Sequence, residues 1–309
     1  MKTDYDLIIV IPVGPNCKVE FIEDTINSIK YYCHCTYKIL ISDDSQKRTG
    51  DTIKEIFPEI DLLRHKKTHG LHGGLYITLS LAFKYVLDHY SFQLLLRMDT
   101  DALITGFNPQ DEAIKLFKNS PKTGIAGVYR KSKNPVDSFG NVIDNEWLRN
   151  QIVALAFTRR LLRQPIANYT LRKILIDAFK NGYDIGENVF GGAYFVSELF
   201  LRKLDEAGLL PESKLAAVVL EEDHIFGILA KSIKFDLGDL ESGSLPFGCA
   251  WRGLPASPEV LWEQGKKIIH STRFWQDLKE PEIRQFFREK RIKEGAQTMS
   301  DRINSGTVE

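Results

Sequence analysis

Two carboxylates, Asp99 and Asp101, stand one residue apart at the end of the apolar run "LLLRM" at 94–98. Side chains alternate faces along an extended chain, so both carboxylates are expected to point the same way. Neighbouring anions repel each other unless a cation lies between them, and hard carboxylate oxygens suit Mg²⁺ or Mn²⁺. The pair therefore predicts a divalent metal site that carries a diphosphate; two solvated loop carboxylates are the alternative.

A second acidic pair, Glu222 and Asp223, opens the helical stretch "EDHIFGILAKS" at 222–232. The partial positive charge of a helix N-terminus favours the anionic form of both carboxylates. An ionised carboxylate can take a proton from a reacting hydroxyl group, so the pair is a candidate for general base chemistry. Simple capping of the helix is the alternative.

Two further segments carry residue types that suit a phosphate. The glycine-rich turn "HGLHGG" at 69–74 leads into a helix whose free N–H groups, including that of Gly74, could face a phosphate. A plain strand-to-helix turn explains it equally well, because the Lys-Ser/Thr ending of a P-loop is missing. "KKIIHSTRFW" at 266–275 ends an apolar run and carries Arg273, which could pair with a diphosphate.

Four apolar runs in the first third predict strands that are buried on both faces, because they are rich in Ile, Leu and Val and alternate little. The runs are 6–14, 37–45, 60–67 and 92–101. Helix-period stretches at 21–32 and 74–90 lie between them, so the fold class is α/β with a doubly wound, mostly parallel sheet. The carboxyl ends of such strands meet along one edge, where ligands bind.

The rest of the chain predicts additions to this sheet. A polar, turn-rich segment and two helices, at 146–163 and 170–180, form a helical insertion over residues 131–185 that we expect to lie over the ligand edge of the sheet. A strand and a helix at 187–207 return to the main body. We place one domain at 1–240 and a C-terminal extension that completes the site at 241–309, with about the last 15 residues disordered.

From about residue 6 to about residue 274 the chain resembles the inverting glycosyltransferases of family 2, which have the GT-A fold. The landmarks are "VIPVGPN" (10–16), "ILISDDS" (39–45), "MDTD" (98–101) and "LEEDHIFG" (220–227), the last preceded by "FGGAYFVSELFLRKL". Their order and spacing carry the resemblance. Val13, Cys17 and Tyr76 depart from the family pattern, which bears on the nucleotide and on how its ribose is held.

The resemblance implies a sugar transfer, with inversion, from a nucleoside diphosphate donor (UDP, GDP or dTDP) to a glycan, lipid-linked or small-molecule acceptor. We expect the insertion at 131–185 to shape the choice of acceptor. Asp223 would be the base and Glu222 the anchor of the acceptor hydroxyl. Mn²⁺ or Mg²⁺ would be held by Asp99, Asp101 and His270, although a lone His after a strand is often a surface or core residue. The donor would be bound by Pro12, Val13, Asp43, Asp44, Gly74, Asp99 and Arg273.

Composition limits the partners. Lys plus Arg and Asp plus Glu number 41 each, so the formal net charge is zero. No overall field attracts nucleic acid or an anionic membrane, and any polyanion must be bound by a local group of charges. The apolar stretch near the N-terminus is too short to span a bilayer, and no other segment is long enough. Four irregularly spaced cysteines favour free thiols in a reducing cytoplasm.

Three other functions stay open on the sequence. "LLLRMDTDAL" also resembles the first motif of HAD-like phosphatases, in which an apolar strand delivers a nucleophilic Asp. A sugar nucleotidyltransferase shares the doubly wound architecture, but "PVGPNCK" is a poor match to its glycine-rich, basic loop. A non-catalytic sugar-binding protein on the same fold is the third alternative.

Overall fold

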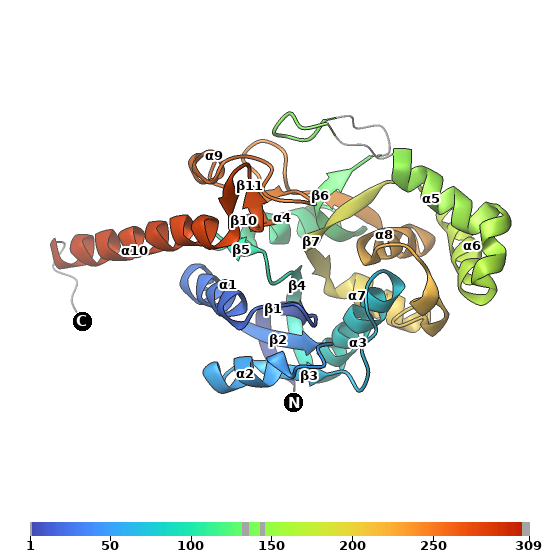
Figure 1. Cartoon of the computed structure of the whole chain (residues 1–309), viewed down its shortest axis with the longest axis horizontal. Helices are drawn as coiled ribbons and strands as arrows, with labels where there is room; N and C mark the ends of the chain where they lie inside the picture. The colour runs from blue at the N-terminus through green and yellow to red at the C-terminus, as the bar shows by residue number, and fades with distance from the viewer. Residues whose placement is uncertain (1, 132–135, 143–145, 305–309) are drawn as a thin grey trace.

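The computed structural model describes residues 2–131, 136–142 and 146–304, with side chains described as far as residue 296. Its main feature is a seven-stranded mixed sheet with strand order β3-β2-β1-β4-β7-β6-β8, flanked by helices (Figure 1). The strands are β1 (Thr3–Val13), β2 (Tyr37–Asp43), β3 (Asp61–Arg64), β4 (Tyr90–Met98), β5 (Leu103–Ile104), β6 (Thr123–Arg130), β7 (Asn188–Ser197), β8 (Asp236–Asp239), β9 (Phe247–Cys249), β10 (Ile268–His270), β11 (Phe274–Trp275) and β12 (Leu278–Lys279).

The α-helices are α1 (Val19–Tyr32), α2 (Thr49–Ile56), α3 (Gly73–His89), α4 (Asp111–Asn119), α5 (Glu146–Phe157), α6 (Pro165–Lys180), α7 (Glu198–Glu206), α8 (Glu222–Ser232), α9 (Pro258–Glu263) and α10 (Glu280–Asn304). Two 3₁₀ helices, η1 (Arg159–Arg163) and η2 (Ser213–Ala217), are short connecting turns. Among the described residues, none of the helices combines the length and the apolar composition that a membrane-spanning helix needs.

The predicted doubly wound sheet is confirmed. Strands β3, β2, β1 and β4 are parallel, β7 is antiparallel to its neighbours β4 and β6, and β8 is parallel to β6. The registers place Val13 at the end of β1 beside Asp43 at the end of β2. The carboxyl ends of β1, β2 and β4 therefore lie along one edge, as expected.

Strand β1 shows why the apolar runs lack alternation. Ile8 and Val10 belong to the core on one face of the sheet, which is covered by α3, α6, α7 and α8. Ile9 and Ile11 belong to the core on the other face, with α1 and α2. Because both faces are buried, a continuous apolar run is the stable pattern for this strand.

The predicted helix at 146–163 divides into α5 and η1. The break follows Phe157, where the Thr158 side chain accepts a hydrogen bond from the Arg160 N–H and caps η1. Pro165 then begins α6, since a proline at the first helical position loses no intrahelical hydrogen bond. The described part of the 131–185 segment is therefore helical where helices were predicted, and residues 132–135 and 143–145 lie outside the described residues.

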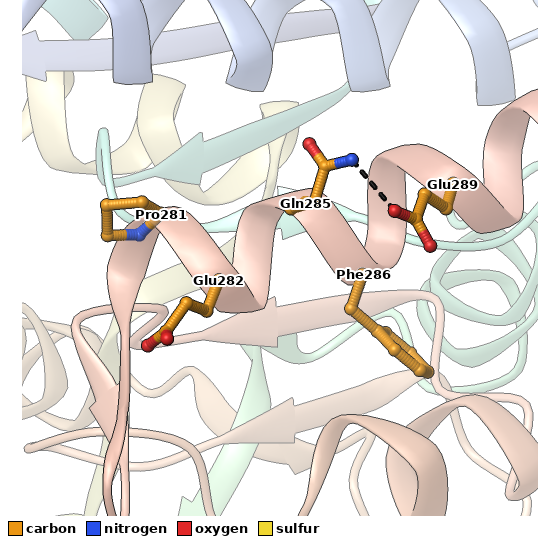
Figure 2. A pocket seen from close by; sticks show the side chains of 5 residues that line it. All are labelled: Pro281, Glu282, Gln285, Phe286 and Glu289. Atoms are coloured by element: carbon orange, nitrogen blue, oxygen red, sulfur yellow. Dashed lines mark hydrogen bonds between the residues drawn. The ribbon is translucent and has the colours of Figure 1, made fainter.

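The C-terminal region ends in α10, which continues into the segment where we expect disorder, and residues 305–309 lie outside the described part. Ile283 and Phe287 anchor the helix in a small core beneath β5 and β10. A surface hollow runs along α10 (Figure 2) and is lined by Pro281, Glu282, Gln285, Phe286 and Glu289. It contains none of the predicted site residues, so the candidate chemistry lies elsewhere.

Candidate metal site and acceptor carboxylates

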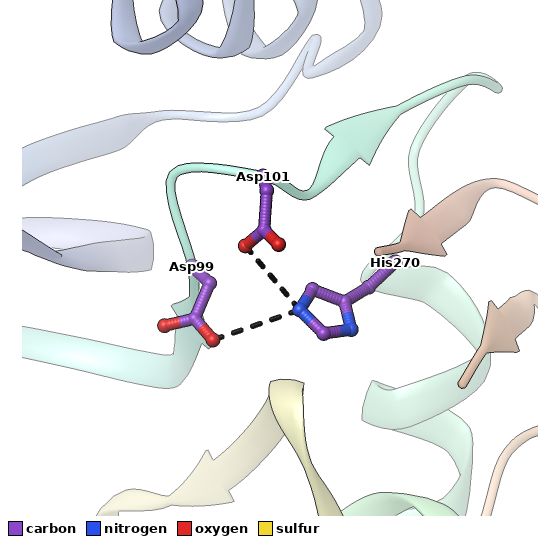
Figure 3. A group of neighbouring side chains, drawn as sticks. All are labelled: Asp99, Asp101 and His270. Atoms are coloured by element: carbon purple, nitrogen blue, oxygen red, sulfur yellow. Dashed lines mark ion pairs between the residues drawn. The ribbon is translucent and has the colours of Figure 1, made fainter. Parts of the chain in front are cut away.

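Asp99, Asp101 and His270 converge on one point (Figure 3). Each offers one ligand atom, and the three atoms lie within 4.8 Å of one another. His270 Nε2 is 3.3 Å from Asp101 Oδ1 and 3.7 Å from Asp99 Oδ2. The His is far away in sequence but close in space, because β10 pairs with β5, the strand that directly follows the carboxylate motif.

The His270 ring is oriented for ligation. Its Nδ1 lies 3.0 Å from Ala250 O, and since a carbonyl only accepts, Nδ1 carries a proton and donates it. Nε2 is thereby directed at the carboxylates, the arrangement usual for metal-ligating histidines. Burial would lower the pKa of His270, but the charges of Asp101 and Asp99 outweigh burial and raise this pKa. Two carboxylates and an imidazole fit Mn²⁺, which accepts oxygen and nitrogen ligands.

Asp101 is buried, and both of its carboxylate oxygens have polar partners. Its Oδ2 accepts a hydrogen bond from Ser271 Oγ at 2.7 Å and lies 2.8 Å from Arg273 Nε. Burial would raise the pKa of Asp101, but His270, Arg273 and Ser271 together outweigh it and hold this pKa well below its usual range. The rest of the Arg273 side chain is exposed at the rim of the site, where we predicted a contact with the diphosphate.

Two consecutive glycines of β7 separate the Asp99–Asp101–His270 group, called the metal group below, from the Asp223 carboxylate. Gly192 O accepts the Asp99 N–H at 2.7 Å, and a Cβ at position 192 would lie 2.4 Å from His270 Nδ1. Gly191 N–H donates to Asp223 Oδ2 at 2.7 Å. At position 192 only glycine allows the close approach of His270, and Gly192 also has a φ of +91°. The metal group and Asp223 therefore flank neighbouring residues of one strand.

Asp223 lies at the start of α8, as predicted, and it is buried. Besides Gly191, its partners are the His224 N–H, which donates to Oδ1 at 2.8 Å, and the Asn188 amide, 3.5 Å from Oδ2. These groups fix the carboxylate in one orientation, with its oxygens as acceptors. Its role as the base stays a prediction.

Glu222 is joined to the metal group by Arg97, which is a residue the sequence analysis overlooked. The Arg97 side chain is 1% exposed, and its Nη2 lies 2.8 Å from Asp99 Oδ1 and 3.0 Å from Glu222 Oε1. The guanidinium also lies over the Tyr194 ring. The available signal was a lone cation inside the apolar run "LLLRM", because an Arg in a buried strand needs an anionic partner.

The pKa of Glu222 differs from what its position at a helix N-terminus suggests. Burial raises the pKa of Glu222 to about 8, although Arg97 acts to lower it. We expected the helix N-terminus to keep this carboxylate anionic, and that expectation is wrong in direction for Glu222. The reason is that a helix end stabilises a charge by at most about 2 kcal/mol, less than the cost of removing a carboxylate from water.

Helix α10 supports the turn that carries Asp99 and Asp101, called the metal motif below. The buried Arg284 donates from Nη2 to Thr100 O at 2.7 Å, so it holds the residue between the two metal carboxylates. Its Nη1 lies 3.2 Å from Asp24 Oδ2 on α1. Asp24 is also paired with Arg291. The sequence gave no local signal for this support, because the partners are separated by more than 180 residues.

The predicted donor residues of β1 and β2 lie at the expected edge. Pro12 and Val13 are buried at the end of β1, and Cys17 Sγ in the following turn is 3.4 Å from Thr100 Oγ1. Asp43 is buried and accepts the N–H of Ser45 at 2.8 Å and that of Gly50 at 2.9 Å.

The Asp44 carboxylate holds the glycine-rich turn, because it accepts the N–H groups of His69 and Gly70 at 3.0 and 3.2 Å. Gly74 is buried, and its N–H donates to Leu71 O at 3.0 Å, so the expectation that this N–H is free to face a phosphate is wrong. These hydrogen bonds stabilise the loops at the sheet edge. The proposed contacts of Asp43, Asp44 and Gly74 with a nucleotide stay predictions.

No protein-family model matches the chain, and no curated protein matches it. Among solved structures, the chain is similar to the mannosyltransferase PcManGT from Pyrobaculum calidifontis in complex with GDP-Man and Mn²⁺, with 12% identity, a TM-score of 0.43, and coverage of 76% of this chain and 54% of that one. It is similar to the apo structure of the bifunctional glycosyltransferase WbbM, with 9% identity, a TM-score of 0.48, and coverage of 93% and 50%. The chain thus spans about half the length of these two proteins, and at these values the likeness concerns the fold alone.

Proposed function

We propose that the protein is a metal-dependent glycosyltransferase that moves a sugar, with inversion, from a nucleoside diphosphate donor to an acceptor hydroxyl. The observation that carries the proposal is the position of Asp223 and of the Asp99–Asp101–His270 group on either side of Gly191 and Gly192. A proton acceptor and a cation site next to each other are what such a transfer needs. A bound Mn²⁺ or Mg²⁺ would neutralise the negative charge that develops on the leaving diphosphate.

The side chains have separate tasks in this scheme. Asp223 accepts the proton of the acceptor hydroxyl as the new glycosidic bond forms, and Gly191 and Asn188 hold it in place. Glu222 anchors the acceptor hydroxyl. Arg97 connects Glu222 to Asp99, so that the acceptor side and the donor side keep one fixed spacing. Arg273, at the rim, is positioned to meet the diphosphate.

A thermal-shift panel tests the donor class. The full-length protein is heated with UDP-, GDP- and dTDP-sugars, GDP-mannose among them, with and without Mn²⁺. We expect one nucleotide to stabilise the folded state only when Mn²⁺ is present, by about 2.7 kcal/mol at a concentration 100 times its Kd. Asp101→Asn should remove this effect, whereas Asp177→Asn on the exposed face of α6 should keep it.

Three results would contradict the proposal. The first is the absence of metal-dependent stabilisation by every nucleotide sugar in the panel. The second is steady release of phosphate from p-nitrophenyl phosphate with Mg²⁺, which would favour the phosphatase alternative. The third is binding of the donor without hydrolysis or transfer to any acceptor, which would favour the non-catalytic sugar-binding protein.

A further inference from the structure

The segment from α5 to α6 exposes large apolar side chains beside cations. Leu162 and Ile166 are 71% and 70% exposed. A single exposed leucine or isoleucine is ordinary on a protein surface, so the informative feature is that several such side chains occur in one segment. We call the exposed side of residues 147–176 the hairpin surface. Its large apolar members are Trp147, Phe157, Leu162, Ile166, Tyr169 and Ile176.

The charges of the hairpin surface have one sign. Residues 147–176 contain no Asp or Glu, in a chain whose acids and bases balance. The cations are Arg149, Arg159, Arg160, Arg163, Arg172 and Lys173, and all of them are exposed. Within the described residues none of them is in an ion pair, whereas Arg202 on α7 pairs with Glu198 at 2.5 Å. The six cations outnumber the two acids that border the segment, Glu146 and Asp177, so the hairpin surface is a local basic patch on a neutral protein.

The apolar and basic side chains lie together in space. Helix η1 has the sequence "RRLLR", and the first turns of α6 follow it directly. The Arg172 guanidinium lies 5.5 Å from the centre of the Phe157 ring, so α6 and the end of α5 share this surface. Figure 1 shows α5 and α6 side by side at one end of the molecule, with α10 at the opposite end.

We propose that the hairpin surface docks onto an anionic lipid bilayer. Exposed aromatic and aliphatic side chains enter the boundary between headgroups and acyl chains, and arginines bind the lipid phosphates. Nucleic acid would satisfy the arginines but offers no apolar phase for Leu162 and Ile166. This inference does not depend on the proposed transfer reaction.

The hairpin surface is connected to the candidate site through α8. Helix α6 packs against α8, the helix that begins with Glu222 and Asp223. The Gln151 amide of α5 donates to Val219 O at 2.6 Å, just before α8 begins. A bilayer bound by the hairpin surface is therefore held at a fixed orientation relative to α8.

Co-sedimentation with vesicles tests the proposal. The full-length protein is mixed with vesicles of phosphatidylcholine alone or of phosphatidylcholine with phosphatidylglycerol. We expect partitioning into the anionic vesicles that falls with added salt, and little into the neutral ones. Leu162→Ser with Ile166→Ser should lower the partition coefficient about tenfold or more. Neutralising Arg159, Arg160 and Arg163 to Gln should lower it about fivefold for each arginine.

Matched controls come from α7. Leu199→Ser replaces another exposed leucine, and Arg202→Gln removes another exposed arginine; neither should change the partitioning. All these side chains are solvent-exposed, so the thermal unfolding of each variant should match that of the wild type.

Three results would overturn the proposal. One is a wild type that stays in solution with anionic vesicles. Another is a Leu162→Ser, Ile166→Ser variant that binds them as the wild type does, which would show adsorption by charge alone. The last is a stable dimer in light scattering that the same variant dissociates, which would show that a second copy covers this surface.

Discussion

The buried carboxylate of Glu222 gives a prediction about the pH dependence of stability. Its pKa is raised from 4.5 to about 8 in the folded protein. Below about 4.5 the carboxyl group is protonated in both the folded and the unfolded state, so its contribution to stability is fully present there. As the pH rises toward 8, the unfolded state releases this proton and the folded state keeps it, so stability falls.

Glu222→Gln isolates this contribution, because Gln resembles the protonated acid in size and hydrogen bonding and does not titrate. For each pH unit between about 4.5 and 8, the contribution of Glu222 to the free energy of unfolding falls by about 1.4 kcal/mol. Between about pH 5.5 and 7.5 the free energy of unfolding of the wild type should therefore fall by roughly 2 to 3 kcal/mol relative to the variant. Other titrating groups are common to both proteins and cancel in the difference.

Urea unfolding at several pH values measures this difference directly. Glu55→Gln on α2 is the matched control; the Glu55 side chain is exposed, so water solvates its charge and the difference from wild type should stay flat. A difference between wild type and Glu222→Gln that is also constant with pH would refute the reasoning. It would mean that Arg97 keeps Glu222 ionised and that burial does not dominate.

Three other substitutions give expected outcomes. Asp101→Asn should weaken Mn²⁺ binding by about 10- to 100-fold in isothermal titration calorimetry, because one anionic ligand is lost; unchanged affinity would place the cation elsewhere. Gly192→Ala should lower the free energy of unfolding by more than the roughly 1 kcal/mol expected for Gly182→Ala. Both glycines have positive φ, but only at position 192 would the new methyl group also collide with a side chain, that of His270. Equal losses in urea unfolding would argue against that close approach. Arg284→Met should lower the free energy of unfolding by about 3 to 5 kcal/mol and weaken Mn²⁺ binding, because it leaves buried Asp24 with less compensation. The Arg288 side chain is 49% exposed, so Arg288→Met should lower the free energy of unfolding by about 1 kcal/mol or less. Similar losses for the two variants would show that the buried contact does not support the metal motif.

Much of the sheet could be predicted because its pattern is local. β1, β2 and β4 are buried on both faces, so each is a continuous apolar run, and the polar residues that end these runs mark the sheet edge. Strand β6 and helix α10 were not predicted. The apolar anchors of α10, Ile283 and Phe287, are few among its charges, and they pack against a core formed by other elements.

The sequence by itself determined that an apolar strand ends in the pair Asp99 and Asp101 and that Glu222 and Asp223 open a helix, since both follow from local residue patterns. The strand alternation that we expected to align the two aspartates is wrong, because β4 ends at Met98 and Asp99 to Asp101 lie in a turn where the Ala102 N–H donates to Asp99 O at 3.1 Å. The tertiary structure decided which groups meet: β10 brings His270 to the carboxylates, and two glycines of β7 separate that group from Asp223. It also decided the charges, because burial beside Arg97 sets the protonation of Glu222. Proximity and desolvation depend on contacts between distant segments, and no local pattern specifies them.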